Sequence, residues 1–312
     1  MQNRISSLRS TLYPHFPPEL EREIFQIAAL AHQRTIPTLM LVAARVKHWV
    51  EPLLYRIIVL CYPTGHAPHY ASKVLGLPIF SIQILLRVIA TKSPEFLRKS
   101  VRHLFLDIPI EPSIQNTIWT VCSGVVNLYI DPPLAVVMGG LQHLRRLTLW
   151  VSEFVKCCSV ASTRPLLANV THLALIGGLI SAEYTRKLLP CLSLMVGLTH
   201  ISLGSISGYG SRMHTTLCAK ANLQCILFSI PTDDWEDELQ TAHPALLDDS
   251  RFLCLRGERS CAENWLLGAD TGEDYWTLAD TFLRARREGK VDRSLIAILN
   301  TDTSIWETHL TI

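Results

Sequence analysis

The sequence has no hydrophobic run long enough to cross a membrane, and we expect no secretory signal. Its most apolar stretch, residues 74–90, is interrupted by Pro78, Gln83 and Arg87, whereas a membrane span needs about 20 nearly unbroken apolar residues. Residues 1–16 contain no apolar segment of the kind that a signal peptide carries. We therefore expect no membrane association and a location in the cytoplasm or the nucleus.

Cysteine pairs are also missing. The chain has nine cysteines, an odd number, and none of them forms a CxxC pair. Cys218 and Cys225 are too isolated for a zinc site, and Cys157 and Cys158 are adjacent. This pattern predicts buried thiols in a reducing compartment, with no disulfide framework, no metal and no cofactor.

Motifs of known enzyme classes are absent as well. The glycine-rich segment 204–210 matches neither the nucleophile elbow nor the dinucleotide fingerprint, and no phosphate-binding loop is present. The twelve histidines show no HExxH spacing. We predict a protein that is not an enzyme and has no catalytic residues; an enzyme with a site built from scattered residues is the alternative.

Charged residues are few, at 18%, and their signs are unevenly distributed. Residues 1–231 contain 21 lysines and arginines against 10 acidic residues, whereas residues 232–312 contain 8 against 17. The positive excess of the first region is consistent with an acidic protein ligand. The alternatives are that the two regions attract each other or are simply two differently composed solvated surfaces. The acidic balance of the second region argues against a nucleic-acid partner, even though residues 284–290 are rich in arginine.

What the sequence does contain is a repeated pattern, apolar-x-x-apolar-x-apolar, in seven segments spaced by 19 to 28 residues. This spacing is close to the period of leucine-rich repeats. The last two apolar positions alternate as in a strand, and a helix fits between successive segments. The Asn or Cys that normally follows the motif is absent, which predicts irregular repeats; a non-repeating α/β core is the alternative. The fourth positions of the segments are Leu104, Leu128, Leu147, Leu173, Ile201, Ile226 and Leu253.

Three histidines recur within these repeats. His103, His172 and His200 each precede the fourth position, on the face opposite the apolar pair. A row of imidazoles there would titrate near neutrality. We interpret the row as a solvated position inherited from the repeat rather than as a metal site.

A short helical unit precedes the repeats. Pro17 and Pro18 stand at a helix start, Glu19 and Glu21 occupy its first turn, and residues 20, 24 and 27 fall on one face. A second helical pattern covers residues 35–60, and Pro52 either breaks it or opens a third helix. The apolar stripe fits either the core of a three-helix unit or a surface that docks onto another protein.

Pro-Pro-Glu-Leu at residues 17–20, Ile-Phe at 24–25, Leu-Val at 41–42 and Trp49 occur in the order of an F-box. The segment 36–56 and the phrases at 93–106, 122–130 and 272–291 resemble the F-box-like proteins that are abundant in mushroom-forming fungi, so the resemblance spans nearly the whole chain. In contrast to the usual F-box, Ala43 and Ala44 follow Val42 where a Cys is common, and Trp49 comes seven residues after Val42.

The resemblance implies an adaptor that docks onto a Skp-type protein of a cullin–RING ubiquitin ligase. It implies that the concave face of the repeats holds a protein substrate. Carried over by position, the docking residues are Pro17, Pro18, Leu20, Ile24, Phe25, Leu41, Val42 and Trp49.

The carboxy-terminal region is predicted to form an acidic cap. Residues 272–290 have an acidic start, a basic end and an apolar stripe that includes Tyr275 and Phe282, which is typical of a helix. Residues 231–240 gather five carboxylates around Trp235, as a helix start or as a recognition loop.

Together these patterns predict an α/β fold in which an F-box-like unit (14–60) and a helical connector (61–100) precede an irregular leucine-rich-repeat solenoid (101–256) and an acidic cap (257–312). The predicted function is a non-catalytic substrate-recognition adaptor of a Skp–cullin–F-box ubiquitin ligase. The alternative is a repeat-based interaction scaffold without ubiquitin-ligase docking, in which the amino-terminal helices only cap the repeats.

Overall fold

The computed structural model describes residues 16–62, 64, 66–133, 138–177, 182–204, 211–229, 244–257 and 259–299. The chain divides into two compact units, Met1–Tyr55 and Arg56–Ile312. We call the first the amino-terminal unit and the second the sheet unit, and describe each by itself.

The amino-terminal unit is helical. Helix α1 (Pro18–Ala31) has Pro17 at its N-cap and Pro18 as its first residue. It is followed by η1 (Gln33–Thr35), α2 (Ile36–Leu39) and α3 (Ala44–Leu54). Its small core consists of the fully buried side chains of Ala29, Ile36, Val46 and Val50. The predicted first helix is therefore confirmed.

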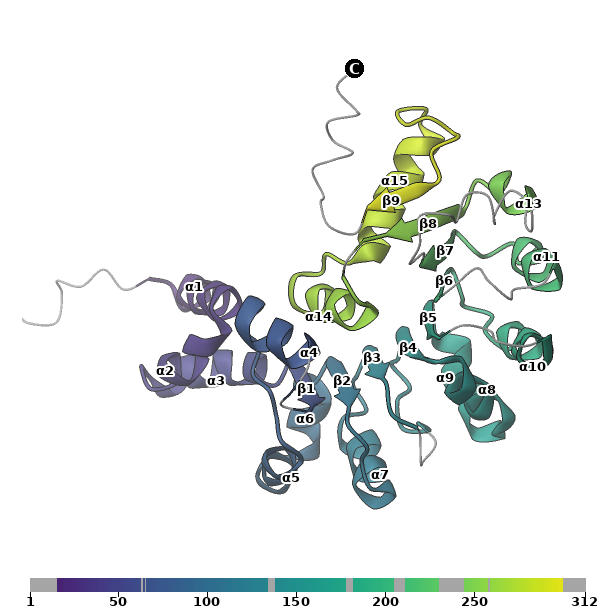
Figure 1. Ribbon diagram of the computed structural model, residues 1–312. Coiled ribbons are helices and arrows are strands. Elements are labelled where there is room, and N and C mark those ends of the chain that lie inside the picture. Colours follow the sequence, from purple (N-terminus) through teal and green to yellow (C-terminus); the bar gives the residue numbers. More distant parts are fainter. Residues whose placement is uncertain are drawn as a thin grey trace, which may run out of the picture. The chain divides into compact units, whose positions relative to one another are not determined.

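The described residues of the sheet unit form a nine-stranded sheet in which every neighbouring pair is parallel and the strands follow one another in chain order (Figure 1). Such a sheet needs a crossover between successive strands, which helices and turns supply here. The strands are β1 (Ile57–Cys61), β2 (His103–Asp107), β3 (Asn127–Ile130), β4 (Arg146–Trp150), β5 (His172–Ile176), β6 (His200–Leu203), β7 (Cys225–Ser229), β8 (Phe252–Arg256) and β9 (Ala297–Leu299).

Helices cover both faces of this sheet (Figure 1). Helices α14 (Cys261–Thr271) and α15 (Tyr275–Arg287) lie on one face, which we call the inner face. The short α4 (His66–His69) and η2 (Tyr70–Val74) connect β1 to the helices of the other face, and Ala71 of η2 joins the inner core. The other face carries α5 (Ile82–Thr91), α6 (Pro94–Ser100), α7 (Pro112–Val121), α8 (Val151–Ser159), η3 (Ala161–Thr163), α9 (Arg164–Asn169), α10 (Ala182–Ser193), α11 (Ser211–Ala219) and α13 (Pro244–Leu247).

The predicted fold class, a helical unit followed by an irregular leucine-rich-repeat solenoid, is wrong. The structure is an α/β fold built on one parallel sheet that starts at β1, before the predicted repeats, and ends at β9, inside the predicted cap. Its strands are buried on both faces because α14 and α15 cover the face that a solenoid would leave open. The apolar pattern indicates buried parallel strands. It is the same for an open solenoid and for a sheet with helices on both faces, so it does not distinguish them.

The seven predicted strand segments are strands, β2 to β8. Six of the predicted equivalent residues pair in register from Leu104 to Ile226, but the partner of Ile226 is Phe252 rather than Leu253. Residues 57–60, predicted within a helical pattern, form most of β1 instead. The predicted helix at 272–290 is confirmed as α15, which Asp274 caps by accepting a hydrogen bond from Thr277 N.

All nine cysteines are free, and seven of them are buried, which confirms the prediction of buried thiols. The predicted acidic segment 231–240 lies outside the described residues, as do residues 205–210 of the glycine-rich segment.

Candidate protein-binding surface

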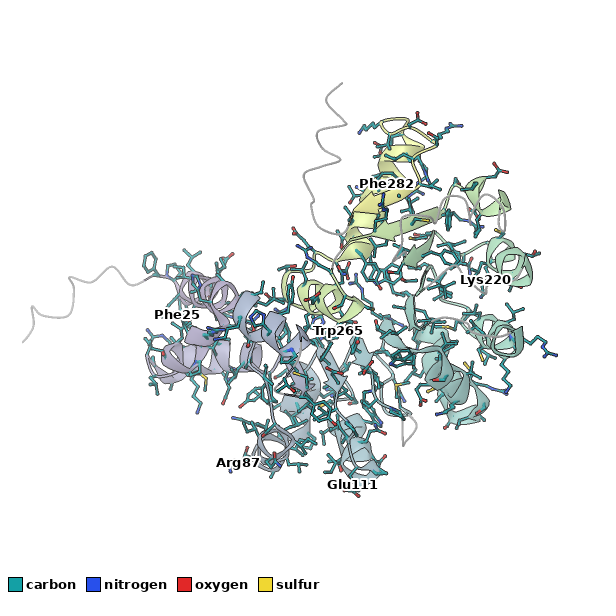
Figure 2. All side chains as sticks on the ribbon, viewed as in Figure 1. Phe25, Arg87, Glu111, Lys220, Trp265 and Phe282 are labelled. Atoms are coloured by element: carbon teal, nitrogen blue, oxygen red, sulfur yellow. The ribbon has the colours of Figure 1, made fainter. Side chains whose placement is uncertain are left out.

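Helix α1 has two different faces. On the side that packs on α3, Ala29 is fully buried and Phe25 contacts the core (Figure 2). Glu21, on the same side, accepts hydrogen bonds from Arg45 Nε and Nη2 at 2.9 and 2.8 Å, an ion pair that fixes α1 against α3. The buried Ala29 and this ion pair hold that side of α1 against α3.

The opposite side of α1 is apolar and exposed. Leu20, Ile24 and Ile27 follow one another at helical spacing, with exposed fractions of 48%, 51% and 60%. We call these three residues the α1 stripe. Leu and Ile side chains at three successive positions of one helix face form the kind of apolar surface that a helix presents to a hydrophobic groove.

A second apolar group lies in the turn between α2 and α3. The turn is held by hydrogen bonds from Leu41 N to Thr38 O and from Val42 N to Leu39 O, both at 3.1 Å. The backbone is thus fixed while the side chains of Leu41 and Val42 remain 85% and 60% exposed. An ordered turn that presents two apolar side chains is suited to contact with another protein.

The predicted docking residues fall into two groups. Pro17, Pro18, Leu20, Ile24, Leu41 and Val42 are exposed. Phe25 and Trp49 are half-buried and pack against the core of the unit. Ile27 was not assigned to docking from the sequence, although its spacing from Ile24 places it in the same stripe.

The open strand face that the resemblance assigns to a substrate is covered in this structure. Trp265 of α14 lies against the sheet, within 5.5 Å (ring centroids) of Phe105 (Figure 2). Phe282 of α15 belongs to a second buried cluster with Leu227 and Leu253. The inner face is therefore part of the hydrophobic core.

The histidine row lies on this inner face, so its interpretation as a solvated position is wrong. The rings of His172 and His200 stack at 4.1 Å between centroids, with the edge of Trp276 against them. His200 Nε2 is 2.8 Å from Asp280 Oδ1 on α15. Burial, together with His200 and Arg146, lowers the pKa of His172 to about 3. The stacked pair thus joins the sheet to α15, through Trp276 and Asp280.

Burial also lowers the pKa of the third histidine, His103. His103 lies with its ring edge toward Trp265, and burial, with the nearby Arg56, lowers its pKa to about 3. Among the described residues, no cluster of three or more His, Cys, Asp or Glu side chains has the arrangement of a metal site.

Two carboxyl groups meet at the carboxyl ends of β2 and β3. Burial and the adjacent Asp131 raise the pKa of Asp107 to about 6, and Trp150 Nε1 donates to Asp131 Oδ1 at 2.7 Å. The nearby thiol of Cys61 has a pKa raised to about 11 by burial and by Asp107. A thiol that is protonated at neutral pH is a poor nucleophile, so this cluster does not have the properties of a catalytic cysteine site.

No protein-family model matches the chain, and no curated protein sequence matches it. In the part of the chain that the structure describes, every helix is too short or too polar to cross a lipid bilayer.

Proposed function

We propose that this protein is a non-catalytic adaptor of a cullin–RING ubiquitin ligase. The amino-terminal unit docks onto a Skp-type subunit, and the sheet unit holds a protein substrate. The supporting observation is the α1 stripe, an apolar helix face that stays exposed although the unit has a complete core of its own. Such an adaptor works in the cytoplasm or the nucleus.

The size of the α1 stripe fits a docking role. Full burial of one Leu or Ile side chain is worth about 1.5–3 kcal/mol. The three stripe residues and the two turn residues are each about half exposed or more, so their burial against a partner contributes several kcal/mol. A helix with anchors at positions i, i+4 and i+7 suits a hydrophobic groove.

The sheet unit offers exposed basic side chains to an acidic substrate. Arg98, Arg102 and Arg145 are exposed and lie at the end of α6 or directly before β2 and β4. They belong to the region of the chain with the positive excess, residues 1–231. Substrate binding through them is expected to weaken as salt is added.

The docking half of the proposal is tested by binding of the full chain to a purified Skp-type adaptor. Ile24→Asp is expected to weaken binding by about 100-fold or more, because it places a charge in an apolar contact. Leu41→Asp provides a second position, in the α2–α3 turn. The matched control is Ile84→Asp on α5, since Ile84 is 49% exposed and Ile24 is 51% exposed.

Each variant is first checked for an unchanged thermal transition. Wild-type protein that fails to bind the adaptor contradicts the proposal and favours the scaffold without ligase docking. Folded Ile24→Asp protein that binds as tightly as wild type contradicts the role of the α1 stripe.

A further inference from the structure

A cavity of about 180 Å³ lies on the inner face of the sheet, at the carboxyl ends of β5 to β8. Ala174 of β5 and Ser202 of β6, which pair in register, line it from the strand side. Leu255 of β8 also lines it from the sheet, and Asn264 of α14 and Tyr275 of α15 line it from the helices on this face.

The cavity exists because of one row of residues that pair across neighbouring strands and face the inner side. The side chains in this row become smaller from β2 to β6. In this row Phe105 pairs with Tyr129, and their rings stack at 4.3 Å and fill the space under Trp265. The same row continues through Thr148 to Ala174 and Ser202. These small side chains do not fill the space beneath the helices, so a void remains.

The wall of the cavity carries a buried polar group with an unused acceptor. Asn264 is 2% exposed, and its Nδ2 atom donates to the carbonyl oxygens of Arg259 and Ser260 at 3.3 and 3.0 Å. These two bonds fix the amide. Its Oδ1 atom receives no hydrogen bond from any residue that the structure describes, and is thus available to a donor in the cavity.

The lining of the cavity includes one basic residue. Arg259 lies directly before the capping box of α14, in which Glu263 Oε2 accepts a hydrogen bond from Ser260 N at 2.8 Å. Arg259 has five N–H donors, so it can bind an anion in addition to a protein partner. The rest of the lining includes the apolar side chains of Leu255 and Ile176.

We propose that this cavity binds a small carboxylic acid with an apolar, hydroxyl-bearing body. The carboxylate pairs with Arg259, the hydroxyl donates to Asn264 Oδ1, and the body packs against Leu255 and the ring of Tyr275. An apolar cavity of about 150 Å³ holds benzene, so a cavity of about 180 Å³ accommodates the ring of such a ligand, with its carboxylate toward Arg259. The proposal is independent of adaptor docking.

The binding is non-covalent. The only thiol in the lining, Cys261, has its pKa raised to about 12 by burial, so it is protonated at neutral pH. Its position nevertheless makes it a local reporter. Cys218 is the control, because these two are the half-buried cysteines of the chain and the other seven are buried.

The experiment uses the full chain and 3-hydroxybenzoate as the probe, with ligand-observed NMR for affinity. A dissociation constant on the order of 1 mM is expected for a molecule of this size. The probe is expected to slow maleimide labelling of Cys261 severalfold and to leave Cys218 unchanged. Both rates are followed by peptide mass spectrometry over a long incubation, because burial raises the pKa of both thiols and protonated thiols react slowly. Benzoate, which lacks the hydroxyl, and 3-hydroxybenzyl alcohol, which lacks the charge, are each expected to bind more weakly.

Two substitutions locate the site. Arg259→Gln is expected to weaken the binding of 3-hydroxybenzoate at least fivefold. The binding of 3-hydroxybenzyl alcohol, which has no charge, is expected to weaken less than twofold. Arg256→Gln is its matched control, since residue 256 follows Leu255 on the strand and points to the opposite face. Ala174→Leu fills the cavity and is expected to abolish binding of both molecules; Ala174→Val replaces it if the leucine variant does not fold.

The proposal is overturned if 3-hydroxybenzoate does not bind at 20 mM, well above the dissociation constant of about 1 mM expected for its size. It is equally overturned if binding survives a folded cavity-filling variant, or if Cys261 and Cys218 are protected alike. Because Ile24→Asp does not touch the cavity, that variant is expected to bind the probe as wild type does, whichever way the adaptor test ends.

Discussion

Helices α1 and α15 carry similar apolar stripes but are buried very differently. The α1 stripe is 48–60% exposed, whereas Tyr275, Ala279 and Phe282 of α15 are at most 5% exposed. The reason lies in what each helix packs on. A broad sheet covers the whole apolar side of α15, whereas α3 covers only the side of α1 that holds Phe25 and Ala29.

This difference shows that helical periodicity alone does not identify a core helix. An apolar stripe at helical spacing indicates that one side of the helix is buried. The surface that covers it can belong to the same chain or to another protein. In α15 the covering surface is internal. In α1 it is absent from the unit, which is why we propose a partner for it.

The largest expected effect comes from removing a core side chain of α15. Phe282→Ala is expected to lower the free energy of unfolding of the sheet unit by about 3–5 kcal/mol, because it leaves a cavity beside Leu227 and Leu253. The control is Phe16→Ala, since Phe16 is 62% exposed and Phe282 is 1% exposed. Urea unfolding of both variants measures the contrast; equal effects would contradict the assigned burial.

A smaller effect is expected from acid. The half-buried His172 stays neutral down to about pH 3 in the folded chain, whereas an unfolded histidine takes up a proton near pH 6.5. Between these values the unfolded state binds more protons, so stability falls as the pH drops below about 6.5. By pH 5 this histidine is expected to cost on the order of 1–2 kcal/mol.

The control for this acid effect is His172→Gln. Its urea unfolding, compared at pH 8 and pH 5, is expected to show a smaller loss of stability than wild type over the same interval. A loss as large as that of the wild-type chain would mean that His172 is not kept neutral by its position between the sheet and Trp276.

The smallest expected effect is on the α1 stripe. Ile24→Ala is expected to change the stability of the amino-terminal unit by less than about 0.5 kcal/mol, since the side chain is already half in water. Thermal unfolding measures this. A loss of about 2 kcal/mol or more would place Ile24 in a core and remove the distinction between the two helices.

Much of the secondary structure was predictable from the sequence. The apolar spacing identified β2 to β8, and the capping and charge pattern identified α1 and α15. Strand β1 was missed because Ile57–Leu60 is a short continuous apolar run, and periodicity does not separate a buried strand from a buried helix in such a run. Of the candidate site, the exposed residues Leu20, Ile24, Leu41 and Val42 were named, but their exposure was not predictable.

The sequence by itself determined which residues avoid water and with which spacing, because that spacing follows from the geometry of a strand or a helix. Only the tertiary structure decided what covers them. It placed α14 and α15 on the inner face, enclosed the histidine row, left a cavity where Ala174 and Ser202 are too small to fill it, and left the α1 stripe exposed. These outcomes depend on contacts between residues far apart in the chain, such as His200 with Asp280, which no local pattern encodes.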